Sequence, residues 1–227
     1  LLFQKREKAF CCVKTWQRAF LMYTGTNQRK TEYIRKENRK KGGMRMPRVY
    51  LSPSLQEYNL YVNGGTEEEI TNLIADAMEP YLLASGIEFT RNRPEMSLGE
   101  AIAASNTGNY DLHFAIHSNA APESLAGKLQ GVDAYYFYNS PYGREMADIV
   151  TENMKQVYPD GEKVQSVATA TLRELRRTNA PAVLVEVGYH DNVEDAQWIK
   201  ENIDQIAQAL AKSIADYFGV PFRQPQV

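Results

Sequence analysis

The chain has 227 residues, long enough for one sizeable domain or two small ones, and its 43% hydrophobic and 24% charged residues are ordinary for a soluble globular protein. Its only two cysteines are neighbours, Cys11 and Cys12, so the sequence supports neither a disulfide framework nor a thiolate metal site. No apolar run approaches the roughly 20 residues of a membrane-spanning helix, and no signal peptide is recognisable.

The beginning of the chain is strongly basic and the rest is acidic. Residues 1–48 hold 14 Lys and Arg against 3 Asp and Glu, whereas the remainder holds 12 against 25. We therefore expect residues 1–46 to form a separate, disordered basic segment. The alternatives are binding to a polyanion, or a natural start at Met44 or Met46 that makes the upstream residues non-native. A net charge of −13 over the remainder argues against nucleic-acid binding.

The first predicted elements lie between residues 49 and 105. A helix is predicted over 66–84, because Thr66 and Glu69 fit a capping box and apolar residues then recur at helical spacing until Gly86. In chain order, the sequence predicts a strand at 49–51, this helix, a strand at 87–90 and a helix at 97–105.

The second half of the chain continues the alternation of strands and helices. The predicted elements are strands at 112–116, 132–138 and 181–187, helices at 143–157 and 167–175, and one or two helices within 192–218. This order predicts the α/β class, with a mostly parallel twisted sheet and helices on both faces. We assign residues 47–220 to a single domain and residues 221–227, which include two prolines, to the start of a linker or tail.

Polar groups occur where the predicted strands end. His117, followed by Ser118 and Asn119, ends an apolar strand, and Glu186 lies inside the run AVLVEVGYH. Glu67 lies in the first turn of the helix after the first strand, where a helix-start charge is the alternative to a functional role. Functional groups of open α/β sheets collect at the carboxyl ends of strands. A buried carboxylate such as Glu186 is costly unless it is paired, hydrogen-bonded or metal-bound, so a structural ion pair and a functional role remain open.

Four stretches share the order and spacing of a known family's motifs: TEEEITNLIADAM (66–78), TRNRPEMSLGEAI (90–102), DLHFAIHSNA (111–120) and TNAPAVLVEVGYHDN (178–192). With them, the region from Val49 to about Val220 resembles the zinc-dependent N-acetylmuramoyl-L-alanine amidases of the type-3 family, which cleave peptidoglycan. The resemblance implies a catalytic domain at 47–220, one Zn²⁺ ion and peptidoglycan as the substrate.

The resemblance also implies roles for matching residues. His117 is similar to a zinc ligand, and Glu67 is similar to the carboxylate ligand, with Glu68 as the alternative by register. Glu186 is similar to the catalytic base. In this chemistry zinc lowers the pKa of a bound water to about 7, and a carboxylate passes the proton of that water to the leaving amine.

Two more residues are implied to contact the substrate or a ligand. Asn119 follows the histidine ligand and is expected to orient a ligand or the substrate. Arg176 matches an arginine upstream of the last strand and is expected to meet substrate charge, with a surface salt bridge as the alternative.

The sequence departs from the family pattern after the first strand. Typical members place another zinc-binding histidine there, whereas residues 52–59 of this chain read SPSLQEYN. Hydrolytic zinc sites usually have three protein ligands, so Glu57 or His190 is expected to complete the shell, or the site is degraded. His113 lies about 13 Å along the strand from His117, which favours a hydrogen-bonded core histidine.

The expected function is therefore hydrolysis of the amide between N-acetylmuramic acid and L-alanine of the stem peptide. The alternatives are a catalytically impaired cell-wall-binding protein and a zinc metallopeptidase that acts on cell-wall peptides. We expect an extracellular or cell-wall location, as for a bacterial autolysin or phage endolysin, with no nucleic-acid or membrane partner. A cell-wall-binding module beyond the C-terminus is a further expectation.

Overall fold

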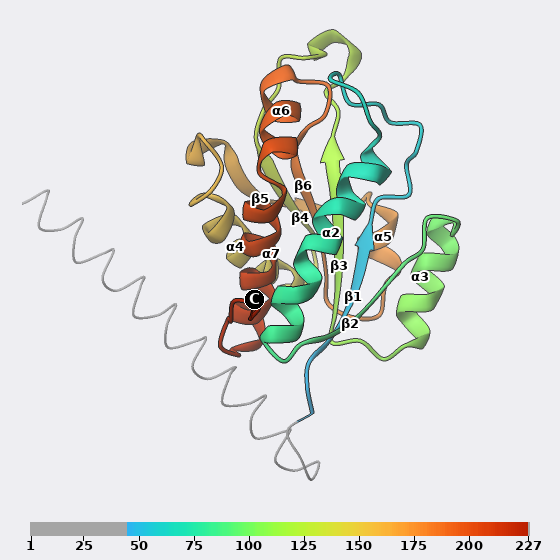
Figure 1. Ribbon diagram of the computed structural model, residues 1–227. Helices are drawn as coiled ribbons and strands as arrows, with labels where there is room; N and C mark the ends of the chain where they lie inside the picture. Colours follow the sequence, from blue (N-terminus) through green and yellow to red (C-terminus); the bar gives the residue numbers. More distant parts are fainter. Residues whose placement is uncertain (1–44, 227) are drawn as a thin grey trace, which may run out of the picture. The chain divides into compact units, whose positions relative to one another are not determined.

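A six-stranded sheet forms the centre of the part of the chain that the structure, a computed structural model, describes, residues 45–226 (Figure 1). Its spatial order is β2-β1-β3-β6-β4-β5, and all neighbours are parallel except β4 and β6. The strands are β1 Arg48–Pro53, β2 Glu88–Arg91, β3 Leu112–Asn119, β4 Val132–Phe137, β5 Val164–Thr169 and β6 Ala182–Tyr189. The predicted α/β class with a mostly parallel sheet is thus confirmed.

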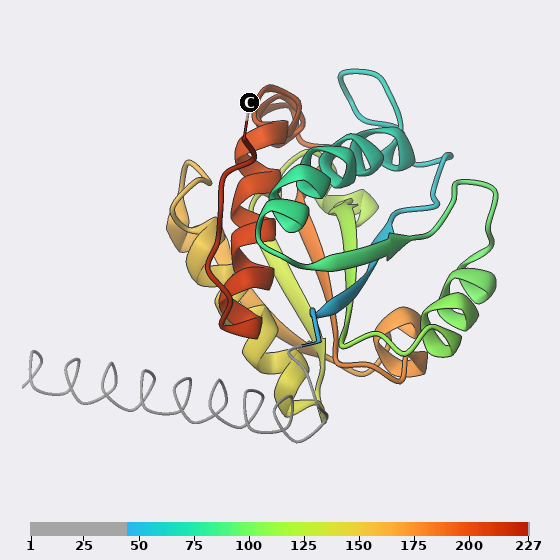
Figure 2. The same cartoon turned by 60° about the horizontal axis from the view of Figure 1, so that its bottom comes forward.

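Helices cover both faces of this sheet unequally. The larger layer contains α2 (Glu67–Ala84), α4 (Pro141–Met154), α6 (Val193–Glu201) and α7 (Ile203–Phe218). The smaller layer contains α3 (Leu98–Thr107) and the short α5 (Arg173–Arg177). Figure 2 shows α2, α4 and α7 together on one side of the strands, with α3 and α5 grouped on the other. The thin layer leaves room for a cleft on its side of the sheet.

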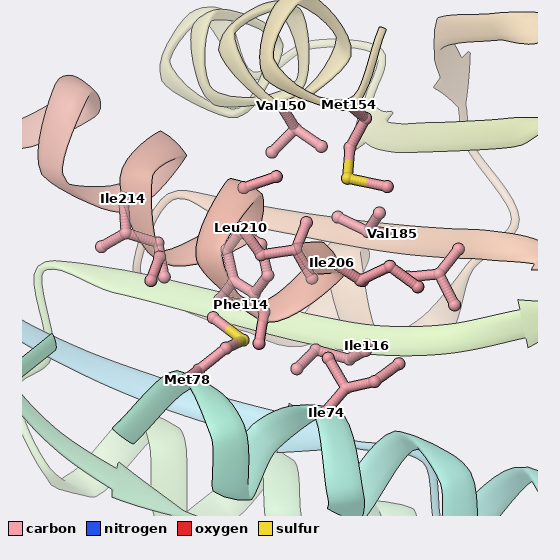
Figure 3. Close-up of a cluster of buried hydrophobic side chains, with 14 of the residues drawn as sticks. Ile74, Met78, Phe114, Ile116, Val150, Met154, Val185, Ile206, Leu210 and Ile214 are labelled. Carbon is pink, nitrogen blue, oxygen red and sulfur yellow. The ribbon is translucent and has the colours of Figure 1, made fainter. Parts of the chain in front are cut away.

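The main hydrophobic core lies between the sheet and the larger helical layer. Phe114 and Ile116 of β3 meet Ile74 and Met78 of α2 there, with side chains of α4 and α7 closing the cluster (Figure 3). Successive residues of a strand point to opposite faces. The residues between these core positions therefore point to the thin layer, where Ala115, Ala182, Leu184 and Leu175 form a smaller cluster.

The capping box that predicted the start of α2 is confirmed in the structure. The Thr66 hydroxyl accepts a hydrogen bond from the Glu69 amide at 3.1 Å, and the Glu69 carboxylate accepts one from the Thr66 amide. Ser97 and Glu100 form a second capping box at the start of α3. These local pairs satisfy amide groups that have no partner within their helices.

The predicted helix at 167–175 is wrong. Residues of β5 pair in parallel with β4, from Val132 with Val164 to Phe137 with Thr169, and only Arg173–Arg177 is helical. β5 is an edge strand with most of its side chains partly or fully exposed, so its apolar residues show no clear alternation. The sparse apolar positions were compatible with either period, and pairing with β4 determines the outcome.

The structure describes nearly all of the predicted C-terminal tail but little of the predicted basic segment. The predicted basic segment at 1–46 lies, apart from its last two residues, outside the described residues. Within the predicted tail, Phe222 stacks on Tyr81 of α2 with ring centroids 5.8 Å apart, and the amide of Arg223 donates to the Ser85 hydroxyl at 3.0 Å. None of the helices between residues 45 and 226 has the length and apolar character required to cross a membrane.

Candidate active site

The site is built where β3 and β6 end side by side. The two strands stay in register from His113 with Ala182 to His117 with Glu186. Beyond that pair β6 contains one extra residue before Asn119 meets Tyr189, which is a β-bulge. Since neighbours in register point to the same face, His117 and Glu186 project together on the thinly covered side of the sheet.

Glu67 reaches this point from the first turn of α2. Its side chain is buried, and its carboxylate accepts hydrogen bonds from Asn59 Nδ2 at 2.6 Å and from the amide of Ser118 at 3.3 Å. Its Oε1 lies 2.9 Å from Nδ1 of His117. Burial opposes ionisation, but the hydrogen bonds from His117 and Asn59 outweigh it and hold the pKa of Glu67 below its usual value.

His117 lies between two carboxylates. Nδ1 faces Glu67, and Nε2 lies 3.5 Å from Oε2 of Glu174. Burial alone would lower the pKa of His117, but the two carboxylates, together with the charge of Glu186, raise it well above its usual value. The ring is therefore held in one orientation by groups on both sides.

Glu174, which the sequence analysis missed, comes from α5 and is almost fully buried. Its Oε1 accepts hydrogen bonds from Nε2 of His113 at 2.8 Å and from the Ser52 hydroxyl, and Nδ1 of His113 lies 2.9 Å from the Ser105 hydroxyl. Burial opposes its ionisation, but the hydrogen bonds of His113 and His117 keep the pKa of Glu174 well below its usual range. The prediction of a hydrogen-bonded core role for His113 is confirmed.

Glu186 is the carboxylate with an unfilled bonding position. Its Oε2 is buried and, among the described residues, has no hydrogen-bond partner. Burial raises the pKa of Glu186 from 4.5 to about 7; the charge of His117 opposes this shift, and the carboxylates of Glu67, Asp133 and Glu174 add to it. Asp133 is its register partner on β4. A carboxyl group that titrates near neutral pH in a cleft is a candidate proton acceptor.

A cavity of about 360 Å³ opens in front of these groups. His117, Glu174 and Glu186 contribute its polar lining, and Tyr58, Met96 and Leu184 are among its apolar lining residues. Arg173, in the first turn of α5, also lines the cavity. The combination of apolar walls with a few converging polar groups is typical of a small-molecule or peptide-binding site.

The structure separates the other residues predicted for the site. The Asn119 amide faces Asp133, with Nδ2 3.5 Å from Oδ2, and its carbonyl oxygen accepts from the amide of Ala120. Arg176 is exposed on α5 and does not line the cavity, whereas Arg173 does. Glu68 is only partly buried, and Glu67 is the residue of this pair that faces His117.

The two residues predicted to complete a metal shell lie apart from the Glu67–His117 pair. Glu57 is exposed in the loop after β1. His190 is buried, with Nδ1 2.9 Å from the backbone oxygen and 3.1 Å from the hydroxyl of Ser118, and its ring lies against Tyr61. Its hydrogen bonds therefore fix it against the last residues of β3.

The described side chains supply fewer ligands than a hydrolytic zinc ion requires. Within residues 45–226, no group of three His, Cys, Asp or Glu side chains is arranged to hold a metal ion. Glu67 and His117 supply two ligand atoms 2.9 Å apart, and the third nearby side chain is the amide of Gln56, with Nε2 3.2 Å from Glu67 and 3.4 Å from His117. Hydrolytic zinc sites use three protein ligands, so the described residues do not fit a complete zinc centre.

The fold and the site together define the class of protein. The chain is an α/β domain with carboxylates and an imidazole gathered at the carboxyl ends of its central parallel strands. Residues 56–216 match the sequence profile of the N-acetylmuramoyl-L-alanine amidases (Amidase_3). The chain belongs to this family.

Individual relatives agree with this assignment. LytC of Bacillus subtilis, an N-acetylmuramoyl-L-alanine amidase, is 27% identical over 163 residues, covering 69% of this chain and 32% of LytC. An endolysin of Bacillus phage SPP1 is 26% identical over 164 residues, covering 68% of this chain and 59% of the endolysin. The solved structure of the N-acetylmuramoyl-L-alanine amidase AmiC2 of Nostoc punctiforme shares the fold, with a TM-score of 0.66 at 21% identity, covering 76% of this chain and 97% of that one. This chain thus spans about a third of LytC and less than two thirds of the endolysin.

Proposed function

We propose that residues 47–220 form a catalytic domain that hydrolyses the amide between N-acetylmuramic acid and the L-alanine of the peptidoglycan stem peptide. Membership of the amidase family and the similarity to LytC support this substrate and this bond. The observation that carries the proposal is Glu186, a carboxyl group with a pKa of about 7 and an unpartnered oxygen in the lining of a cavity.

In the proposed reaction Glu186 acts as the general base. Its ionised form takes a proton from a water molecule as that water attacks the amide carbonyl, and it then returns the proton to the nitrogen of the leaving L-alanine. A base with a pKa near the working pH is effective because a large fraction is ionised while the group still binds a proton readily. No step is assigned to a metal ion, because the described donor set is one ligand short.

The other residues of the site position the reacting groups. Glu174 and Glu67 hold the His117 ring from both sides, beside Glu186. The apolar walls around Leu184 and Met96 exclude bulk water from the carboxylate, and Arg173 offers a positive charge to a carboxylate of the stem peptide. The proposed place of action is the bacterial cell wall, and a wall-binding module beyond the C-terminus stays a prediction.

The test is digestion of purified cell walls with the full chain. The products are separated, and the new chain ends are identified by mass spectrometry. We expect free N-terminal L-alanine with no new reducing sugar ends. Glu186→Gln, which keeps the size of the side chain but cannot accept the proton, is expected to lower the rate by about 10² to 10⁴.

Three outcomes would contradict this proposal. New termini inside the stem peptide would indicate a peptidase, and binding to walls without release of peptides would indicate a recognition protein. Undiminished hydrolysis by Glu186→Gln would remove Glu186 from the role of base.

A further inference from the structure

We propose that Gln56 occupies the third ligand position beside Glu67 and His117 and thereby limits this site to the weak metal affinity of a two-ligand centre. This inference concerns the metal affinity of the proposed active site, and it rests on the proposed function. Its test measures metal binding and not hydrolysis, so the two proposals fail separately.

Three side chains are arranged around one point. Oε1 of Glu67 and Nδ1 of His117 are 2.9 Å apart, and ligand atoms lie about 2 Å from zinc, so one ion can contact both atoms. Gln56 Nε2 lies 3.2 Å and 3.4 Å from the two Glu67 oxygens and 3.4 Å from Nδ1 of His117. The Gln56 side chain is therefore the neighbour common to both ligands.

The Gln56 amide turns its NH₂ group, and not its oxygen, toward the Glu67–His117 pair. An amide binds metal ions through its oxygen, because its nitrogen has no available lone pair. The oxygen of Gln56 accepts a hydrogen bond from the Tyr58 hydroxyl at 3.3 Å, and the NH₂ group points to Glu67. Tyr58 thus favours the orientation in which Gln56 donates to the carboxylate and offers no ligand atom.

Hydrogen bonds hold the segment that carries Gln56 in place. The backbone amide of Gln56 donates to the Ser54 hydroxyl at 3.2 Å. The Ser54 amide donates to the Ile116 carbonyl at 2.9 Å and also lies 3.1 Å from the Thr71 hydroxyl, so the segment is tied to both β3 and α2. A side chain at this position therefore points to the Glu67–His117 pair because the backbone is fixed.

The other side chains considered for a third ligand are exposed or hydrogen-bonded to other groups. Glu57 is exposed, and His190 is hydrogen-bonded to Ser118. Glu174 faces the opposite nitrogen of His117 and accepts hydrogen bonds from His113 and Ser52. No set of three conventional ligand side chains converges within the described part of the chain.

The test is a zinc titration of the full, untagged chain after removal of metal. An untagged chain is needed because the protein has only three histidines, which a histidine tag would outnumber. Affinities are measured by calorimetry against a competing chelator for the wild type, Gln56→His and Gln56→Leu. Loss of a residue that merely orients a ligand costs 10- to 100-fold in metal affinity, so we expect a complete third ligand in Gln56→His to tighten zinc binding by more than about 100-fold.

The matched control is Gln56→Leu, which removes the amide without adding a ligand and is expected to show no such gain. Cobalt absorption spectra give a second readout, because the intense bands of a four-coordinate ion should appear only in Gln56→His. Circular dichroism verifies that each variant is folded. Two more variants, Glu57→Ala and His190→Gln, are expected to leave the zinc affinity of the wild type unchanged.

The proposal is overturned if the wild type binds zinc as tightly as folded Gln56→His, or if that variant gains nothing. It is equally overturned if Glu57→Ala or His190→Gln weakens zinc binding of the wild type by tenfold or more, since the third ligand would then be one of these residues. These two variants keep the test decisive even if Gln56→His does not fold.

Discussion

Two buried carboxylates lie close to the end of β6 and differ in how many donors they have. Asp195, at the start of α6, is 2% exposed and accepts hydrogen bonds from the Tyr158 hydroxyl at 2.5 Å and from the amides of Tyr189 and Gly131 at 2.8 and 3.1 Å. Glu186, on β6 itself, has a buried oxygen with no partner among the described residues. Both regions contain a carboxylate. Both oxygens of Asp195 accept hydrogen bonds, whereas one oxygen of Glu186 accepts none from the described residues.

The difference distinguishes a structural carboxylate, Asp195, from Glu186, the proposed general base. The donors around Asp195 join the β6–α6 turn to β4 and to the residues after α4, so this carboxylate fastens segments together. Oε2 of Glu186 accepts no hydrogen bond from the described residues, and Glu186 lines the cavity. A protein retains such an unfavourable arrangement where the free bonding position is used by a substrate or a water molecule.

The largest expected effect on stability concerns Asp195. Asp195→Ala leaves three buried donors without an acceptor, and each such donor costs about 1–3 kcal/mol, so we expect a loss of at least about 3 kcal/mol of unfolding free energy. Urea denaturation measures it. The control is Asp204→Ala, which removes an exposed acceptor of the Tyr81 hydroxyl and should cost less than about 1 kcal/mol. Equal losses in the two variants would show that the donors around Asp195 contribute nothing special.

The second effect concerns Glu186 and is measured as the pH dependence of the unfolding free energy. Because the pKa of Glu186 is raised from 4.5 to about 7 by folding, the folded state binds a proton more tightly, and ionisation destabilises it progressively as the pH rises from about 4.5 to 7. Glu186→Gln cannot ionise. We expect this variant to be more stable than the wild type by about 1–3 kcal/mol at pH 8, with a smaller difference at pH 5.

Urea denaturation of both proteins across this pH range gives the answer. A stability difference that stays constant with pH would mean that Glu186 is not strained by ionisation, and the contrast with Asp195 would then lose its physical basis.

The smallest expected effect extends the comparison to two arginines of α5. Arg173 lines the cavity, whereas Arg176 is exposed outside it. We expect Arg173→Ala to raise KM about tenfold for a muramoyl peptide with a free carboxylate on its second residue, which corresponds to about 1.4 kcal/mol. Arg176→Ala is the matched control and should leave KM unchanged. Amidating the carboxylate should abolish the difference between wild type and Arg173→Ala; a difference that survives amidation contradicts the proposed contact.

Much of the fold was predictable because its signals are local. The capping box of Thr66 and Glu69 marks the start of α2, and the apolar runs before His117 and around Glu186 mark the two central strands. The sixth strand was missed because the few apolar residues of β5 are compatible with either a strand or a helix, and its pairing with β4 depends on contacts distant in sequence. The antiparallel pairing of β4 with β6 was also not predicted, since the neighbours of a strand depend on contacts distant in sequence.

The candidate site was predictable to the extent that its residues break a local pattern. His117, Glu186 and Glu67 stand out in sequence, and the structure places all three at one end of the sheet. Their assigned roles stay predictions. Glu174 and Gln56 lie in a basic helical turn and a polar loop, where such residues usually face water. Only their contacts with distant residues, such as His113 and His117, bring them into the site.

The bulge at the end of β6 separates the His117–Glu186 pair from the turn that follows the strand. The strands are in register up to His117 and Glu186, and the extra residue that follows, with Gly188 at a φ of +152°, absorbs any offset in the turn beyond. The side chains of His117 and Glu186 therefore stay side by side, although the turn after Tyr189 is offset by one residue from the end of β3.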